Sequence, residues 1–488
     1  MLGHLIRKEL LEHLLSLRFL ILAGLTFLFT IFSLGDGALY YNRALADHRA
    51  ASQATDARIR QIVAFDDRLS YVSFNWGEVF DLGYSVHKPS PVLSTFVRGL
   101  DPVLGRTARV VSTADRWLSR SPGADAPMVD FFPPADLGTI VKIVLSLFVL
   151  LLTYDALCGE KQSGTLRLLS SFPVPRHRVL VAKLIGVLLP VFATFLLPTI
   201  AGIAVVAAFS HVSLTGPEWM RLVVIVSTML LYLGVIASAG LLASTLTQRP
   251  ATSFRLTSFV VGGLAVVVVP RLSLILADWV EPAPSFAFSN DARNTARREL
   301  RQQRNQDMQE WLEDYEKDHG ASYRASREGR EAFYTKMLEA EMTYSPLQRK
   351  KSADLVRTFR NQQDAWLDTG AAIARISPAF ALQNALVSLS GSGLGRHRRF
   401  LDAYLQYLYQ EEDWKDATFT RDQIRRQGPP GKHPPFKWDV SDIPRFDYVD
   451  DWPSSDFLTA LVDVGVLAGW GVVFFAAAWI RMLRYDLR

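Results

Sequence analysis

The stretch YDALCGEKQSGTLRLLSSFPVPRHRVLVAKLIG, residues 154–186, lies between two apolar segments that are each long enough to cross a bilayer. It opens with charged residues, continues with leucines at helical spacing, and reaches PVPR before the chain becomes apolar again. Ser163 is a candidate cap for a short helix over 165–169, which would place Arg167 on a different face from the leucines. The two prolines end that helix and fix its exit angle. A short amphipathic helix between two spans predicts a surface that docks into a groove of a soluble partner.

The rest of the chain has the composition of a membrane protein. Of its 488 residues, 49% are hydrophobic and only 21% are charged, whereas a soluble domain carries about 25% charged residues. The apolar residues gather in blocks that approach the ~20 residues needed to cross a bilayer. These blocks predict an all-α polytopic fold with six transmembrane helices, at 19–38, 138–157, 180–209, 222–246, 256–277 and 457–480.

The distribution of basic residues predicts the orientation of these spans. Lys and Arg gather in the first 18 residues, in a loop at 158–179, in the short loop at 247–255 and in the tail at 481–488. All four segments fall on one side of the membrane if the six spans are real, and the positive-inside rule makes that side cytoplasmic. Both termini are then cytoplasmic, and two long polar segments, 39–136 and 279–456, face the outside.

Residues 1–18 have their own pattern. Leucine and isoleucine recur near helical spacing, and charged residues occupy the other positions. This pattern predicts an amphipathic helix that lies in the cytoplasmic interface of the membrane. The alternative is a simple extension of the first span.

The second outer segment is predicted to be mainly helical. Ser289-Asn290 would cap a helix that Gly320 ends, a further helix covers 325–342, and Ser345-Pro346 opens another that reaches Ile376. Ser377-Pro378 opens the next helix, 394–426 forms the last one, and a proline-rich stretch follows. The aromatic residues in these helices are expected to form a bundle core, or else part of a partner-binding surface.

Three ionisable residues, Lys142, Arg271 and Asp463, lie near the outer ends of predicted spans. Charged groups inside a membrane are costly and are therefore candidates for function. They can also be interfacial residues whose charged ends extend to the headgroups. The sharper hypothesis pairs Asp463 with Lys142 or Arg271 at the mouth of the membrane domain.

Enzymatic motifs are absent from the sequence. A phosphate-binding loop needs G-x-x-x-x-G-K-[ST], and the nearest stretch, GPPGKH at 428–433, lacks Ser or Thr after the lysine. The chain has one cysteine, Cys158, and no H-E-x-x-H motif. The sequence therefore predicts no catalysis, no metal site, no cofactor in this chain and no nucleic-acid binding.

The loop after the second span resembles the permease subunits of ABC transporters of the ABC-2 type. The residues that carry this resemblance stand in the family's order and are Glu160, Gly164, Thr165, Leu166, Ser170, Pro173, Arg176 and Lys183. The resemblance implies that this region, including Arg167, forms a coupling helix that presses into a cleft of a separate ATPase subunit. It also implies that 1–18 is the interfacial connecting helix of such permeases. A charged loop between spans is ordinarily a solvated turn, but the order of these residues favours coupling.

The segments HKPSPVLSTFVRGLDP, 87–102, and ISPAFALQNALVSLSGSG, 376–393, resemble a subgroup with large extracytoplasmic insertions. That subgroup is related to permeases of gliding-motility and nitrous-oxide-reductase maturation systems. The resemblance implies a bacterial plasma-membrane protein that works with ATPase subunits binding ATP and Mg, with a second permease copy or related permease, and with membrane lipids. Two functions are expected: export of a lipid, peptide or other amphipath, or transmission of ATPase-driven motion to an extracytoplasmic partner or lipid-anchored cargo.

Overall fold

A computed structural model describes residues 2–66, 85–109, 118–119, 135–166, 168, 175–209, 212–320, 326–426, 444–448, 452 and 454–484. These residues are almost all helical, which confirms the predicted all-α membrane fold. The chain divides into two compact units, one of Met1–Pro270 with Arg375–Arg488 and one of Arg271–Ala374.

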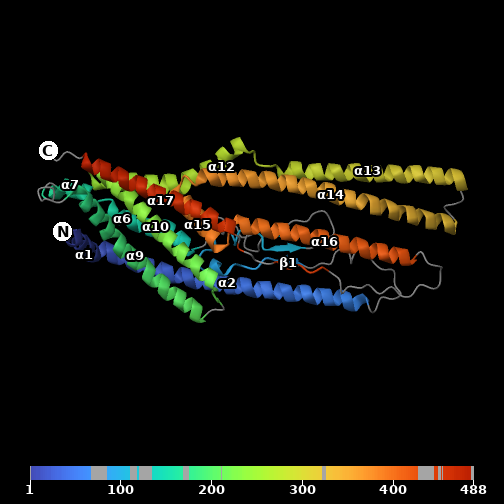
Figure 1. Ribbon diagram of the computed structural model, residues 1–488, viewed down its shortest axis with the longest axis horizontal. Helices are drawn as coiled ribbons and strands as arrows, with labels where there is room; N and C mark the ends of the chain where they lie inside the picture. The colour runs from blue at the N-terminus through green and yellow to red at the C-terminus, as the bar shows by residue number, and fades with distance from the viewer. Residues whose placement is uncertain are drawn as a thin grey trace. The chain divides into compact units, whose positions relative to one another are not determined.

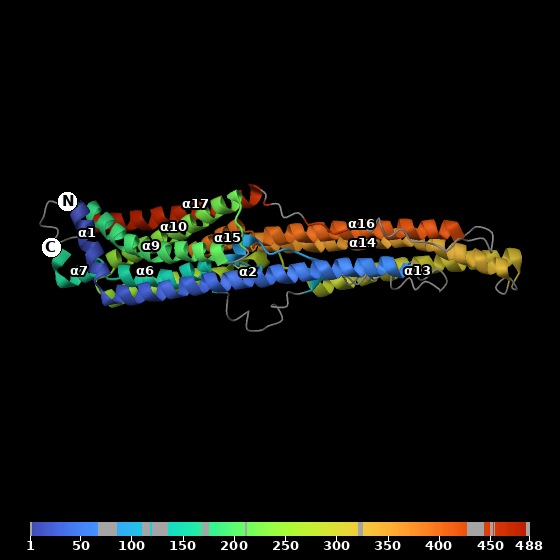
Figure 2. The same ribbon diagram turned by 90° about the horizontal axis from the view of Figure 1, so that it is seen from below.

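The first unit is built on long apolar helices (Figure 1). They are α2 (Leu17–Asp66), α9 (Arg176–Phe209), α10 (Gly216–Leu246) and α17 (Ser454–Leu483). A short helix, α1 (Leu2–Leu14), precedes α2, and the chain turns at Ser16 between them. Because α2 continues well beyond the predicted first span, the beginning of the first outer segment is part of the same helix (Figure 2).

Another apolar stretch is a succession of short helical elements. It consists of α5 (Leu137–Thr139), the π-helix η2 (Ile140–Leu145), α6 (Ser146–Thr153) and α7 (Cys158–Ser163). Asp136 begins the series, because its carboxylate accepts from the N–H of Thr139 at 2.8 Å. Within the described part of the chain, five helical stretches are long and apolar enough to cross a membrane, namely Leu17–Arg60, Leu137–Ser163, Arg176–Ala208, Gly216–Leu246 and Ser455–Leu483.

The predicted span at 256–277 is not one of these five. It falls on three consecutive elements, α11 (Pro250–Thr257), the π-helix η3 (Ser258–Val268) and α12 (Val269–Val280). Pro270 and Arg271 lie at the start of α12, where the division between the two units also falls. A sixth span therefore stays a prediction.

The polar part of the first unit contains a small antiparallel sheet in the order β1 (Ser85–His87), β2 (Thr107–Arg109), β3 (Leu118–Ser119). Val86 faces Ala108, and Ala108 faces Leu118. The helices α15 (Pro378–Ser390) and α16 (Leu394–Arg426) and the 3₁₀ turn η1 (Val92–Thr95) complete this part. The sheet packs on aromatic residues, with Val86 and Ala108 in one buried cluster with Phe400, Tyr404 and Tyr407.

The main core of the first unit lies among the apolar helices. Its largest buried side chains include Phe148, Phe195 and Tyr232, and α15 contributes Leu382 and Leu386 to the same cluster. The helix α15 is thus part of the core that the apolar helices form. Its beginning follows the sequence prediction, because the Ser377 hydroxyl accepts from the N–H of Phe380 at 3.3 Å.

The second unit is a helical hairpin of α13 (Phe286–His319) and α14 (Arg327–Ala374) (Figure 1). Ser285 caps α13 in place of the predicted Ser289-Asn290, and Gly320 ends it with a φ of 75°. Glycine adopts this backbone conformation without the steric cost that other residues meet.

One prediction for the hairpin is wrong: two helices were expected to meet near Ser345-Pro346, but α14 is continuous through Pro346. A proline disfavours helix at the preceding residue and removes one hydrogen bond. Side-chain pairs with α13 hold the helix on both sides of it. Tyr344 donates to Asp307, and Lys351 Nζ lies 3.0 Å from Glu299 Oε2.

Candidate functional site

The short helix α7 is fixed to the end of α10. The Ser244 hydroxyl accepts from the N–H groups of Leu157 and Cys158 at 2.9 and 3.0 Å, so it satisfies donors at the start of α7. In the other direction, Lys161 Nζ donates to the carbonyls of Ser244, Thr245 and Thr247 at 3.2, 2.6 and 3.1 Å. A cation on the last carbonyls of a helix is favoured by the helix dipole.

Lys183 of α9 connects α7 to the N-terminal helix. Its Nζ lies 2.8 Å from Glu160 Oε1 and 3.1 Å from Glu9 Oε1 of α1. The three side chains are largely buried, with 4%, 18% and 11% of their surfaces exposed. Two carboxylates around one ammonium form a strong charge-assisted cluster that joins three helices. We name Glu9, Glu160 and Lys183 the charge cluster.

The helices α1 and α9 pack closely beside the charge cluster, where Gly186 faces Glu9. Gly186 lies one turn after Lys183 on α9, and a Cβ added to it would be 2.6 Å from the Cβ of Glu9. Only a residue without a side chain lets α1 pack so closely on α9 here.

The segment after α7 differs in one detail from its prediction. Ser163 is the last residue of α7 and not the cap of a following helix, and Gly164 ends α7 in the left-handed region with a φ of 78°. The Ser163 and Thr165 hydroxyls lie 2.9 Å apart. Gly164 is thus required by backbone geometry, because few other residues adopt this conformation freely.

The leucines after Gly164 divide between core and surface. Leu166 is 5% exposed and packs in a buried cluster with Leu157, Leu180 and Met482. Leu168 is 66% exposed. The segment is therefore anchored by one leucine and presents the other outward. Arg167, Ser170 and Pro173 lie outside the described residues.

Arg176 fastens the exit of the loop to α17. Its guanidinium Nη1 donates to the carbonyls of Met482 and Leu483 at 3.0 and 2.9 Å. These are the last residues of α17, so Arg176 occupies the position that the dipole of that helix favours for a cation. The loop residues that the structure describes are joined to α1, α9, α10 and α17.

The predicted partner of Asp463 is wrong. Asp463 is fully buried on α17, and its oxygens accept from Arg375 Nε at 2.8 Å and Asn384 Nδ2 at 2.6 Å. Lys142 of η2 instead donates to Gln383 of α15 at 2.9 Å. Arg271, the remaining candidate, has an exposed side chain at the start of the second unit.

Segments 87–102 and 376–393, far apart in the sequence, pack against each other. The N–H of Leu100 donates to the carbonyl of Ser392 at 3.2 Å. Gly99 has a φ of 51°, and a Cβ added there would overlap the hydroxyl of Ser392. The two segments therefore form one structural feature beside α15.

Sequence reasoning missed four residues of these contacts, namely Glu9, Lys161 as a helix cap, Ser244 and Arg375. Glu9 carried a signal, because it follows Leu5 by four residues and so lies on the apolar face of its helix. A charge on that face predicts a buried partner. Ser244 and Arg375 carry no comparable signal, since their partners are 83 or more residues away.

The fold and these contacts define a polytopic α-helical membrane protein with a braced loop between two of its spans. The family model for the ABC-2 family transporter protein matches residues 4–313, and that for a domain of unknown function, DUF3526, matches residues 287–438. The chain belongs to the ABC-2 family and is a membrane subunit of an ABC transporter.

Two similar curated proteins, from Stutzerimonas stutzeri and Pseudomonas aeruginosa, are each called "Probable ABC transporter permease protein NosY". Each is 40% identical over 52 residues, which are 11% of this chain and 19% of the relative. The chain thus matches about a fifth of the length of these relatives. No solved structure matches the chain.

Proposed function

We propose that this chain is the permease subunit that couples ATP hydrolysis by a separate ATPase to movement of its own membrane helices. It performs no catalysis, and ATP and Mg are bound by the ATPase. The protein lies in the bacterial plasma membrane with α1, α7 and both termini on the cytoplasmic side. A second copy, or a related permease, completes the assembly. Family membership and the bracing of the loop at 158–179 support this proposal.

The charge cluster is the observation that carries the proposal. Glu160 binds α9 and, through Lys183, also reaches α1. Breaking a buried ion pair costs about 3–5 kcal/mol, so α7, α1 and α9 move together when a partner pushes on the loop. Exposed Leu168 is a contact for that partner.

The remaining braces extend the same movement to other helices. Lys161 couples the movement of the loop to the end of α10, and Arg176 couples it to the end of α17. Each brace is a set of hydrogen bonds from a cation to helix carbonyls. A displacement of the loop is therefore shared by four helices, which is what a coupling element must do.

Movement of a substrate, such as export of a lipid, peptide or other amphipath, is the first function that this arrangement supports. A second candidate is force transmission to an extracytoplasmic partner or lipid-anchored cargo, without transport. The contacts around α15 favour it. Asp463 of α17 and Lys142 of η2 both bind residues of α15, and α16 begins four residues after α15 ends. Motion of the spans is thereby passed to the polar part of the first unit.

The coupling proposal is tested on the complex with its ATPase, reconstituted in liposomes. Glu160→Lys combined with Arg176→Glu should abolish stimulation of ATP hydrolysis. Because Glu160 is buried against Lys183, the helix content and membrane insertion of the variant are measured beside its activity. The matched control is Glu310→Lys with Arg301→Glu, which makes the same two charge changes at exposed positions of α13. Unchanged co-purification and ATPase activity in the loop variant would remove the proposal.

Hydrogen–deuterium exchange separates the two functions. If force is transmitted, adding ATP to the wild-type complex changes exchange in α16 (Leu394–Arg426). Asp463→Asn should then abolish that change and leave ATP hydrolysis intact. If the chain only moves a substrate, α16 exchanges at the same rate with and without ATP.

A further inference from the structure

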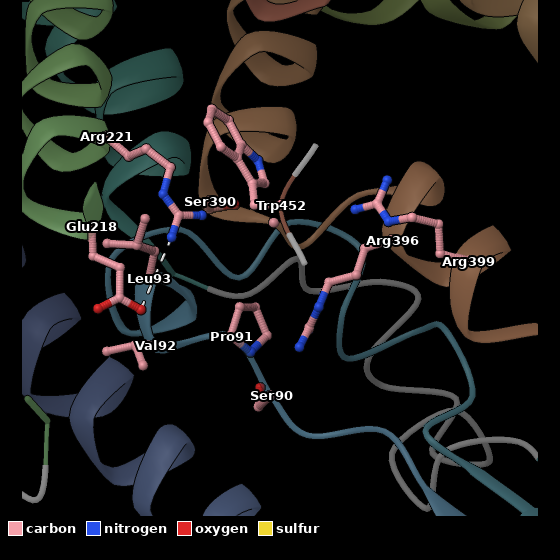
Figure 3. Close-up of a pocket in the computed structure, with 11 residues that line it drawn as sticks. Ser90, Pro91, Val92, Leu93, Glu218, Arg221, Ser390, Arg396, Arg399 and Trp452 are labelled. Carbon is pink, nitrogen blue, oxygen red and sulfur yellow. Dashed lines mark ion pairs between the residues drawn. The ribbon is translucent and has the colours of Figure 1, made fainter. Parts of the chain in front are cut away.

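Arginines in the polar part of the first unit are engaged by neighbouring side chains. In the pocket that Figure 3 shows, the guanidinium of Arg221 lies 4.0 Å from the carboxylate of Glu218. Arg399, which also lines this pocket, makes two bonds to Asp456 at 3.2 and 2.8 Å. Arginines of this kind hold the fold together and leave little charge for another molecule. The hairpin of the second unit differs in this respect.

Four basic side chains of the hairpin are exposed and make no ion pair within the residues that the structure describes. They are Arg298 and Arg301 of α13 and Lys350 and Arg357 of α14. We name these four residues the basic face. Beside it, Arg297 has a buried Nε that finds no hydrogen-bond acceptor in the described part of the chain. The hairpin thus carries cations that its own fold does not neutralise.

The basic face lies on one side of the hairpin. Glu299 of α13 and Lys351 of α14 face each other at 3.0 Å and set the register of the two helices. At about 100° per residue, the basic face is turned at least about 100° away from that pair, in the same sense on both antiparallel helices. Counted from the same pair at ~1.5 Å per residue, its members fall within about 12 Å along the hairpin. The four cations therefore form a compact surface, with two from each helix.

Little negative charge lies close to the basic face. Residues 295–304 and 347–358 together hold eight basic residues and two acidic ones, Glu299 and Asp354. Because Glu299 is already paired, Asp354 is the remaining acidic residue of this stretch. The tip of the hairpin, 305–346, has the opposite character, with ten acidic residues and five basic ones. Positive charge is thus concentrated in one stretch, where it raises the local potential and attracts an acidic partner.

We propose that the basic face docks an acidic helix of a partner protein. Arg298 and Arg301 are three positions apart and Lys350 and Arg357 are seven, so each pair lies on one face of its helix. A helix that lies along the hairpin, with Asp or Glu at matching intervals, places its carboxylates opposite these cations. The proposal goes beyond coupling to ATP hydrolysis, because docking needs neither the ATPase nor ATP.

Asp354 favours a protein over a uniformly charged surface. It lies four positions after Lys350 and three before Arg357, so it shares their side of α14. A bilayer or a polyanionic polymer would meet this carboxylate as well, whereas a protein helix can place a neutral or basic residue opposite it. A second copy of this chain in the same bilayer presents its own basic face at the same level, so the two faces would repel each other.

Binding of a stapled acidic helix to the purified full-length chain in detergent tests the proposal. The probe is an alanine-based peptide with glutamates every three or four residues along one face, and fluorescence anisotropy at low ionic strength measures its dissociation constant. Replacing all four residues of the basic face by Gln should weaken binding at least tenfold. The matched control replaces four cations at other exposed positions by Gln and should change binding less than twofold. These control positions are Arg49, Arg60, Lys317 and Arg330.

Three results with the peptide would overturn the proposal. They are absence of binding, equal weakening in the control variant, and equal binding of a peptide of the same composition whose glutamates are distributed round the helix. Displacement of the peptide by dihexanoyl phosphatidylglycerol, lost in the basic-face variant, would assign the face to lipid and overturn it too.

The variants remain informative if the fourfold replacement disturbs the fold. All four positions are exposed, and the midpoint of thermal unfolding checks that the variant keeps its structure. If it does not, Arg298→Gln with Arg301→Gln and Lys350→Gln with Arg357→Gln are measured as two separate double variants. Each should weaken binding of the striped peptide at least threefold, and unchanged binding in both would overturn the proposal.

Discussion

Lys183 Nζ lies 2.8 Å from Glu160 Oε1, although the two residues are 23 positions apart and belong to different helices. The same ammonium binds Glu9 of α1 at 3.1 Å. The loop that is predicted to dock on an ATPase subunit is thus also bound to the membrane helices. This double role explains why a charged residue is placed at a buried position of an apolar helix.

Replacing Lys183 by Met should be strongly destabilising. The substitution leaves Glu9 and Glu160 buried beside each other with no cation between them, and removal of one partner from a buried ion pair costs about 3–5 kcal/mol. The midpoint of thermal unfolding in detergent measures the effect. Lys8→Met, on the exposed face of α1, is the control and should leave the midpoint almost unchanged. Equal midpoints for the two variants would show that the charge cluster contributes nothing.

Two glycines on α2 should respond in opposite ways to alanine. A Cβ on Gly37 would overlap the carbonyl oxygen of Thr95, whereas a Cβ on Gly35 meets nothing within 4 Å. Gly35→Ala should stabilise the helix by up to about 1 kcal/mol, because alanine is the better helix former. Gly37→Ala should destabilise the protein, because the backbone of η1 must move. Thermal unfolding of both variants checks this, and the same sign of change in both would contradict it.

The sequence predicted well what depends on local pattern. Four of the five long helices begin and end within six residues of a predicted apolar block. Gly164 and Lys183 were both noted from the order of motifs in the loop. The hydropathy pattern did not show that α2 continues to Asp66, although nothing in ADHRAASQATDARIR, residues 46–60, ends a helix. Hydropathy reports only where a helix leaves the membrane.

Contacts between distant segments were the part that could not be predicted. Asp463 was identified as a costly buried charge, but its partner Arg375 stands directly after α14, 88 positions away. Pairing is decided by how helices pack, and no local rule in the sequence encodes that. The meeting of segments 87–102 and 376–393 was beyond prediction for the same reason.

A double-mutant cycle on Asp463 and Arg375 should show strong coupling. Residues in direct contact within one network couple by about 0.5–3 kcal/mol, and this pair is at the upper end because the Asp463 side chain is fully buried. Asp463→Asn, Arg375→Gln and the double variant are compared by chemical unfolding. The exposed pair Lys317 and Asp314, 2.9 Å apart on α13, provides the control cycle and should show no measurable coupling. Additive effects at Asp463 and Arg375 would show that the buried contact is not energetically significant.

Lys88 should make the stability of the first unit depend on pH above neutrality. Burial lowers the pKa of Lys88 to about 8, although Asp101 at 3.5 Å acts in the opposite direction. Between pH 8 and the unfolded value near 10.5, the unfolded chain holds more protons at Lys88 than the folded chain. Stability therefore rises with pH in this window, by up to about 1.4 kcal/mol per pH unit. In Lys88→Met this contribution is absent. The difference in free energy of unfolding between the wild type and the variant should therefore increase in favour of the wild type from pH 8 to 10, and it should be constant below pH 7. Chemical unfolding of both proteins across that range measures the difference, and parallel curves throughout would show that Lys88 keeps its ordinary proton affinity in the fold.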